Sequence, residues 1–152
     1  MSKEALLDRA KAVREGESFD VARMDAWLKQ QRPDLQGTPE VQQFAGGASN
    51  LTYLLKYDNT DLILRRPPFG HKAKGAHDMV REFNVQQALK PVYPAVPTMV
   101  ALCEDASVMD CDFYVMERIR GIIPRANLPK GLQLSEADTR QLCIGVIDKL
   151  IE

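Results

Sequence analysis

Residues 44–53 read FAGGASNLTY, and this stretch decides how the chain is expected to fold on either side of it. Its two glycines separate two runs of strand length, at 41–44 and 51–57, so we expect two strands joined by a glycine-containing connection. Glycine lets the backbone approach a phosphate closely, and the side chains of Ser49 and Asn50 can donate further hydrogen bonds. The stretch therefore indicates a loop that is able to bind phosphate.

Other interpretations of the same stretch have to be weighed against a phosphate loop. An ordinary glycine-containing hairpin has the same pattern and needs no ligand. The spacing is neither G-x-x-x-x-G-K-[ST], the phosphate loop of nucleoside triphosphatases, nor G-x-G-x-x-G opening a helix, the dinucleotide fingerprint. Those two phosphate-binding classes are disfavoured.

The segments around this loop predict an α+β fold built on a five-stranded antiparallel sheet. A turn at 58–61 leads into a third strand at 62–65, which is stopped by two prolines, and this order is typical of an antiparallel meander. Two further strands are expected at 98–103 and 113–117, and helices at 2–14, 20–33, 77–90 and from Ser135 onward. We divide the chain into an N-terminal helical segment at 1–38, a sheet domain at 39–121, and a linker with the final helix at 122–152.

The final helix carries an apolar stripe that has no partner in the predicted sheet domain. Ser135 and Asp138 form a capping-box-like start for it. The stripe consists of Leu142, Cys143, Val146, Ile147, Leu150 and Ile151. The sequence stops within this pattern, so we expect a fragment whose next domain is absent, and self-association through Leu142, Val146 and Leu150.

Composition excludes several classes of function. The chain of 152 residues has 20 Lys and Arg against 21 Asp and Glu, a formal charge of −1. This balance disfavours a nucleic-acid binder, which usually has a basic excess.

Three cysteines without C-x-x-C spacing and two histidines do not indicate a disulfide framework or a zinc site. With no secretory leader and no membrane-spanning run, we expect a cytoplasmic protein that contacts neither nucleic acid nor membrane.

Two charged residues and one apolar strand are candidates for contacts to a nucleotide. Arg65, near the end of the third strand, could reach the phosphates of a nucleotide below the glycine loop, while Arg66 should point to the opposite face. Glu82 on the following helix could pair with Arg65 and hold the guanidinium in place. The segment 113–121 offers backbone groups beside an apolar wall, which suits an adenine edge. Solvated surface charges are the alternative for Arg65 and Glu82.

In this order and spacing the motifs resemble a known family. They are GGASNLTY at 46–53, LILRRPP at 62–68, REF at 81–83 and FYVMERIRG at 113–121, with the pairs Trp27-Leu28 and Val96-Pro97. The sequence resembles the amino-terminal lobe of the aminoglycoside phosphotransferase-like, or kinase-like, phosphotransferases. It is most similar to the branch related to the kinase-like domain fused to some acyl-CoA dehydrogenases. The resemblance implies that residues 39–121 have the fold of a protein-kinase-like N-terminal lobe.

The resemblance also implies an ATP site. Arg65 would occupy the position of the cation that contacts ATP phosphates, commonly Lys in this family, and Glu82 would be its partner on the helix. The segment from Glu117 to Ile119 would be the hinge, with the Glu117 carbonyl and the Ile119 N–H facing adenine. The nucleotide-binding residues implied are Gly46, Gly47, Ala48, Ser49, Asn50, Arg65, Glu82, Glu117, Arg118 and Ile119.

The catalytic loop of the family is not found in these 152 residues. That loop carries an Asp base and an Asn, and a later Asp binds magnesium, so we expect no catalytic residue here and place the Mg²⁺ ligands in a missing lobe. We expect the full-length protein to transfer the γ-phosphoryl group of ATP to a hydroxyl acceptor, and this chain to be inactive alone. A non-catalytic nucleotide-binding module and a protein-interaction module remain alternatives.

Overall fold

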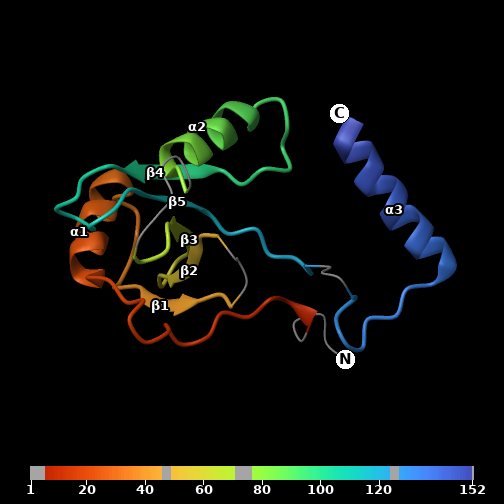
Figure 1. Cartoon of the computed structure of the whole chain (residues 1–152), viewed down its shortest axis with the longest axis horizontal. Coiled ribbons are helices and arrows are strands. Elements are labelled where there is room, and N and C mark those ends of the chain that lie inside the picture. Colours follow the sequence, from red (N-terminus) through yellow and green to blue (C-terminus); the bar gives the residue numbers. More distant parts are fainter. Residues whose placement is uncertain (1–5, 46–48, 71–76, 124–126, 152) are drawn as a thin grey trace. The chain divides into compact units, whose positions relative to one another are not determined.

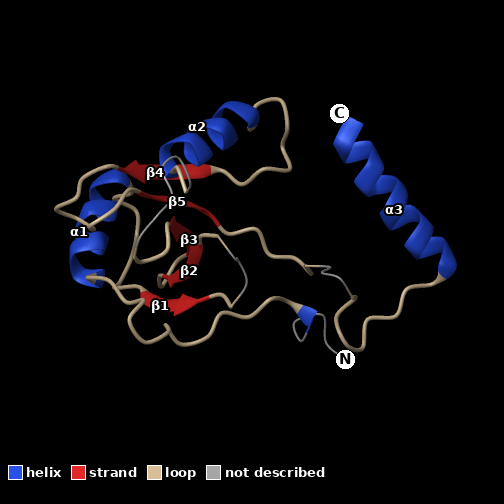
Figure 2. Cartoon of the chain, in the orientation of Figure 1, coloured by secondary structure: helices blue, strands red, loops and turns tan. Residues whose placement is uncertain are grey.

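The computed structural model describes residues 6–45, 49–70, 77–123 and 127–151 of the chain (Figure 1). Contacts divide the chain into two compact units, one of Arg9–Ile119 and one of Met1–Asp8 with Arg120–Glu152. The first unit contains the whole sheet and two of the helices (Figure 2).

The sheet has five strands in the order β1-β2-β3-β5-β4, and all neighbouring strands pair antiparallel. The strands are β1 (Glu40–Gln43), β2 (Leu51–Lys56), β3 (Asp61–Arg66), β4 (Met99–Cys103) and β5 (Phe113–Glu117). The tight β2–β3 connection is closed by a 2.9 Å hydrogen bond from the Tyr57 N–H to the Thr60 carbonyl. The predicted five-stranded antiparallel sheet is therefore confirmed.

One face of the sheet packs against α1 (Val21–Gln31). Asp20 caps this helix by accepting a 3.0 Å hydrogen bond from the Arg23 N–H, as the sequence predicted. Because strand side chains alternate, odd-numbered residues of β2 such as Tyr53 and even-numbered residues of β3 reach the same core. The fully buried members of this core are Met24, Leu28, Tyr53, Leu55, Leu62, Leu64, Cys103, Phe113 and Val115. This face holds the main core and leaves the other face for α2.

The second helix, α2 (Met79–Leu89), packs on β4 and β5 across the other face. Asp78 caps it by accepting from the Arg81 N–H at 2.8 Å. A small core of Met79, Phe83 and Tyr114 joins helix and sheet, with the rings of Phe83 and Tyr114 in an edge contact at 6.1 Å. This packing fixes which side of α2 turns toward the sheet.

The helix predicted over 2–14 is wrong for the residues that the structure describes. Leu6 lies in a 3₁₀ turn, and 8–14 form no helix. Instead, the Lys11 N–H donates to the Gln43 carbonyl at 2.8 Å, and the Gln43 N–H donates to the Lys11 carbonyl at 2.7 Å. These groups extend the sheet at the edge of β1, so they are not available for hydrogen bonds within a helix. Residues 1–5 lie outside the described part of the chain.

The second unit contains α3 (Glu136–Ile151). The predicted capping box is present, because the Ser135 hydroxyl donates to Asp138 at 2.7 Å and accepts from the Asp138 N–H at 3.1 Å. The apolar stripe of this helix is exposed, with Leu150 at 80%. In the part of the chain that the structure describes, no helix has the length and apolar character needed to cross a bilayer.

Candidate functional site

The two adjacent arginines at the end of β3 point to opposite faces of the sheet, as the strand alternation predicted. Arg65 lies on the face that carries α2, and its side chain is 28% exposed. Arg66 points to the other side and is 2% exposed, with its guanidinium 3.8 Å from the ring centroid of Phe69. Arg65 is therefore the arginine of this pair that lines a pocket.

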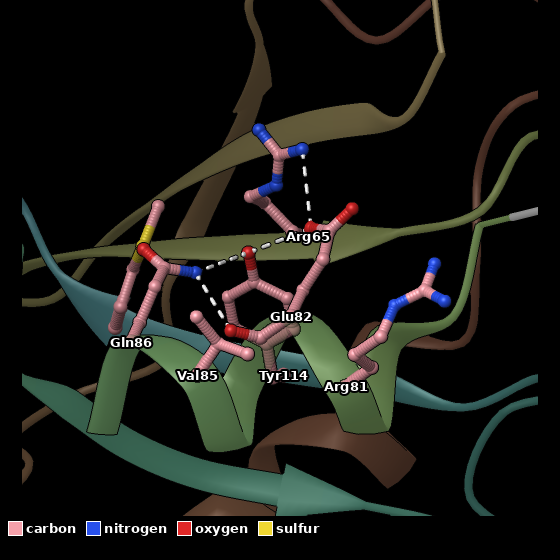
Figure 3. A pocket seen from close by; sticks show the side chains of 7 residues that line it. Arg65, Arg81, Glu82, Val85, Gln86 and Tyr114 are labelled. Carbon is pink, nitrogen blue, oxygen red and sulfur yellow. Dashed lines mark hydrogen bonds and ion pairs between the residues drawn. The ribbon is translucent and has the colours of Figure 1, made fainter. Parts of the chain in front are cut away.

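Glu82 lies in the first turn of α2, which Asp78 caps, and its side chain contacts the sheet through Arg65 and Tyr114. Its Oε2 atom lies 3.3 Å from a terminal nitrogen of Arg65. The predicted ion pair between strand and helix is thus confirmed (Figure 3). Both side chains are about one-third exposed or less, so the pair is only partly screened by solvent.

Two further donors hold the Glu82 carboxylate. The Asn50 amide donates to Oε1 at 2.7 Å, and the Tyr114 hydroxyl donates to Oε2 at 3.1 Å. Tyr114 also accepts from the Gln86 amide at 3.2 Å, and that amide donates to the Glu82 carbonyl at 3.2 Å (Figure 3). Burial raises the pKa of Tyr114, so its hydroxyl stays a donor at neutral pH. Glu82 is therefore oriented from three directions.

The glycine loop is only partly described. Gly46, Gly47 and Ala48 lie outside the described residues, and their predicted phosphate contacts stay predictions. Ser49 is exposed, and its contact to phosphate also stays a prediction. Asn50 is 3% exposed, and its side chain is bonded to Glu82 and to His77. Its predicted contact to phosphate is untested, whereas its contact to Glu82 is direct.

A pocket of about 440 Å³ opens beside the Arg65–Glu82 pair. Its lining consists of Arg65, Arg81, Glu82, Val85, Gln86, Tyr114 and Met116. Two of these side chains are cations, and Val85 and Met116 are apolar. Among the described residues, the buried Nε atom of Arg65 has no hydrogen-bond partner. The pocket therefore combines positive charge for an anionic group with an apolar wall.

An apolar strip leads along the same sheet face toward the end of β5. The strand register pairs Leu54 with Ile63 and Ile63 with Met116, so the three side chains share the face that carries Arg65. Leu54 is 3% exposed and Ile63 is 7% exposed. These two side chains are therefore covered within the chain, and of the three residues only Met116 also lines the pocket.

The predicted hinge begins at Glu117, the last residue of β5. The Glu117 N–H donates to the Thr98 carbonyl at 2.9 Å, and Ile119 is 62% exposed. Arg118 turns its side chain to Asp61, with 2.7 Å between the charged atoms, and both side chains are largely buried. The adenine contacts predicted for Glu117, Arg118 and Ile119 are not tested by this geometry.

Comparison with known proteins identifies the family of the chain. The family model described as the phosphotransferase enzyme family, APH, matches residues 40–151. The chain belongs to this phosphotransferase family. A crystal structure from Ralstonia eutropha JMP134, of a protein provisionally named an aminoglycoside phosphotransferase, superposes with a TM-score of 0.54 at 34% identity, covering 67% of this chain and 28% of that one.

Two curated relatives are acyl-CoA dehydrogenase family members. Member 10 of Mus musculus is 38% identical over 102 residues, which cover 67% of this chain and 10% of that protein. Member 11 of Rattus norvegicus is 33% identical over 136 residues, which cover 87% of this chain and 17% of that protein. The chain thus spans less than a fifth of the length of these relatives. The predicted likeness to the branch with acyl-CoA dehydrogenases is confirmed.

The structure adds residues to the site of this phosphotransferase-family chain that the sequence analysis did not single out. Tyr114, Gln86 and His77 belong to the network around Glu82, and Arg81 lines the pocket. Arg81 is adjacent to Glu82 in the REF motif, so its position could have been noticed. The position of Tyr114 could not have been predicted in this way, because its pairing with Arg65 depends on where β5 enters the sheet.

Proposed function

We propose that the chain binds ATP and is the nucleotide-binding lobe of a phosphotransferase that moves the γ-phosphoryl group to a hydroxyl of a small molecule. The observation that carries this proposal is the Arg65–Glu82 pair at the wall of a pocket. Phosphoryl transfer depends on positioning and charge neutralisation, and a guanidinium held by a carboxylate supplies both to an ATP phosphate.

Arg65 suits this role because its planar fork has several donors. One terminal nitrogen faces Glu82, and the other terminal nitrogen carries two further N–H groups. An arginine can therefore keep its carboxylate partner and still donate to a phosphate oxygen. A lysine would present one compact charge in the same place.

The rest of the nucleotide has complementary surfaces nearby. Met116 in the pocket wall offers an apolar contact to an adenine ring, and the hinge at the end of β5 supplies backbone groups for the edge of that ring. The sequence of the glycine loop before β2 suits contact with the phosphates through backbone N–H groups. ATP in this pose spans the sheet face from Glu117 to Arg65.

The chemical step needs groups beyond these. Magnesium, when bound with ATP, neutralises phosphate charge. Within 6–45, 49–70, 77–123 and 127–151, no three His, Cys, Asp or Glu side chains form a group that could hold a metal ion. The proposal assigns the described residues neither metal ligands nor a catalytic base. Fold and family do not fix the acceptor, so the hydroxyl group is part of the proposal.

The test is an ATP titration of the purified 152-residue chain followed by amide chemical shifts. ATP should shift resonances of β2, β3 and the segment after β5, and Arg65→Gln should raise the dissociation constant at least about tenfold, as expected for a lost bond to a charged group. Lys56→Gln is the matched control, since Lys56 lies on the same face in an exposed pair with Glu40. Absence of saturable ATP binding to the wild type overturns the proposal.

Catalysis is tested separately. The 152-residue chain should not turn over ATP above a no-enzyme control, because no base or metal site is assigned to it. A preparation free of contaminating kinases that hydrolyses or transfers the γ-phosphoryl group would show that the assignment of the chemistry is wrong.

A further inference from the structure

We propose that Asn50 is a positioning residue, which ties the end of the glycine loop to Glu82 and is itself oriented by a hydrogen bond from His77. The role rests on the proposed function, because Glu82 matters for ATP through Arg65. It differs from a phosphate contact, since Asn50 would act through Glu82 without touching the nucleotide.

The amide of Asn50 is buried and is bonded at both its nitrogen and its oxygen. It is 3% exposed, its Nδ2 lies 2.7 Å from Glu82 Oε1, and its Oδ1 lies 2.7 Å from His77 Nδ1. Both distances are short for neutral hydrogen bonds and suit bonds to a charged or well-aligned partner. A side chain with both ends occupied has little capacity left to bind phosphate.

Donor and acceptor chemistry fixes the direction of each bond. The Glu82 carboxylate accepts from Arg65 and Tyr114, so it must also face the NH₂ side of Asn50. The carbonyl oxygen of Asn50 then faces His77, and an oxygen can only accept. His77 must therefore carry a proton on Nδ1.

The three residues join segments that are distant in sequence. Asn50 immediately precedes β2, His77 lies just before the Asp78 cap of α2, and Glu82 is one turn into that helix. His77 has a φ of 60°, a conformation that costs energy for most residues other than glycine and is tolerated by asparagine. The Asn50 side chain thus holds the start of β2 against the start of α2 at two points.

This arrangement makes the position of Arg65 dependent on Asn50. Glu82 loses the donor on Oε1 if the amide is removed, and its carboxylate can then rotate away from Arg65. The end of the glycine loop loses its attachment to α2 in the same step. ATP binding should weaken, while adenosine, which has no phosphates, should bind equally well.

The first set of variants changes Asn50 itself. Asn50→Ala should raise the dissociation constant of ATP about tenfold without changing that of adenosine, as one lost bond to a charged group predicts. The Asn50→Asp variant should bind ATP more weakly than Asn50→Ala, because the substitution places a second carboxylate against Glu82. Thermal unfolding of each variant identifies any that do not fold.

The second set changes His77 and provides a rescue. His77→Asn keeps an N–H near the position of Nδ1 and tolerates the positive φ, so ATP affinity should stay within about twofold of wild type. His77→Ala removes that donor and should weaken ATP binding severalfold. Equal ATP affinity of His77→Asn and His77→Ala overturns the orienting role of His77.

A spectroscopic measurement tests the bond without ATP. Long-range ¹H–¹⁵N correlation spectra of the wild-type chain should show a proton on Nδ1 of His77 at neutral pH, and a neutral ring protonated on Nε2 alone overturns the inference. If the wild-type chain binds ATP and Asn50→Ala has the same ATP dissociation constant, the inference is overturned and the proposed function stands. Wild type that fails to bind ATP overturns the proposed function and the binding role of Asn50 together.

Discussion

The hydroxyl of Tyr114 lies 3.1 Å from Glu82 Oε2, the same oxygen that Arg65 faces from 3.3 Å. Tyr114 is 1% exposed and comes from β5, whereas Arg65 comes from β3, and the two residues are opposite each other in the strand register. A neutral donor and a cation therefore converge on one carboxylate oxygen. The tyrosine limits the rotation of Glu82 that the arginine alone would allow.

Removing this hydroxyl should loosen the pair without removing it. Tyr114→Phe keeps the ring contact with Phe83 and deletes the bond to Glu82. We expect the free energy of unfolding to fall by about 1.5–3 kcal/mol, the range for a hydrogen bond to a charged group. The ATP dissociation constant should rise severalfold. Urea unfolding and ATP titration check both, and unchanged values in both would contradict the role of the hydroxyl.

Glu82→Gln tests the carboxylate directly. The amide has one accepting oxygen, so at least one of the donors Arg65, Tyr114 and Asn50 must face an NH₂ group. ATP binding should weaken while the fold stays largely intact, because a partly exposed ion pair contributes only about 0–1 kcal/mol to stability. Circular dichroism and ATP titration measure the two effects. ATP affinity equal to wild type would show that Glu82 is a solvated helix charge with no site role.

Sequence reasoning predicted the parts of the fold that local signals determine. The Asp20 cap, the strand runs bounded by Gly and Pro, and the Ser135 capping box all appear where expected. Arg65 and Glu82 were paired correctly because alternation on a strand and the face of a helix are local properties, once the two elements are assumed to pack.

The N-terminal segment shows where local reasoning failed. Leu6, Leu7, Ala10 and Val13 have helical spacing, yet Lys11 pairs with Gln43, 32 positions away. A short helix without a packing surface is marginal, and the open edge of β1 offers hydrogen bonds to the same backbone. The choice between the two depends on a tertiary contact that the segment itself does not encode.

Asn50 illustrates the same limit within the candidate site. Its position after a glycine loop suggested a donor to phosphate, but its amide points to Glu82, which lies 32 residues later. A short polar side chain can turn in either direction at that point. Which direction it takes depends on how α2 docks, and only the assembled sheet and helix determine this.

The apolar stripe of α3 should cause the isolated chain to associate. Leu142, Val146 and Leu150 are exposed, and in a solution of the purified chain the available apolar surface is that of another copy. Each large side chain gains about 1.5–3 kcal/mol when fully buried. Light scattering over a concentration series should show association, and Leu150→Glu should shift it to higher concentration. A monomer at all concentrations, with an ordered α3, would contradict this expectation.

Arg66 should matter for stability where Arg65 matters for binding. The Arg66 side chain is 2% exposed, stacks on Phe69, and faces Asp110 at 3.5 Å. Arg66→Ala removes this buried packing, so we expect the free energy of unfolding to fall by about 2–4 kcal/mol. Arg65→Ala should lower it by about 1 kcal/mol or less, since a partly exposed ion pair contributes little. The Asp110 side chain is 79% exposed, so Asp110→Asn should change the free energy of unfolding little. Equal losses of unfolding free energy in Arg66→Ala and Arg65→Ala would refute the distinction.

Alkaline pH should unfold the chain through two tyrosines of the main core. Burial raises the pKa of Tyr53 from 10 to about 12, and its hydroxyl donates to the Glu17 carbonyl at 2.7 Å. Burial, with a hydrogen bond to Asp25 and the charge of that carboxylate, also raises the pKa of Tyr57. Because the unfolded chain loses these protons first, stability is fully present below pH 10 and is lost as pH rises toward 12.

The slope of that loss is measurable. Each tyrosine should reduce the free energy of unfolding by up to about 1.4 kcal/mol per pH unit above the unfolded pKa. Urea unfolding between pH 9 and about pH 11.5 records the slope. Tyr53→Phe, although less stable at neutral pH through loss of the bond to Glu17, should show a shallower alkaline slope than wild type. A variant with the wild-type slope would mean that Tyr53 ionises at the same pH in the folded and unfolded chain.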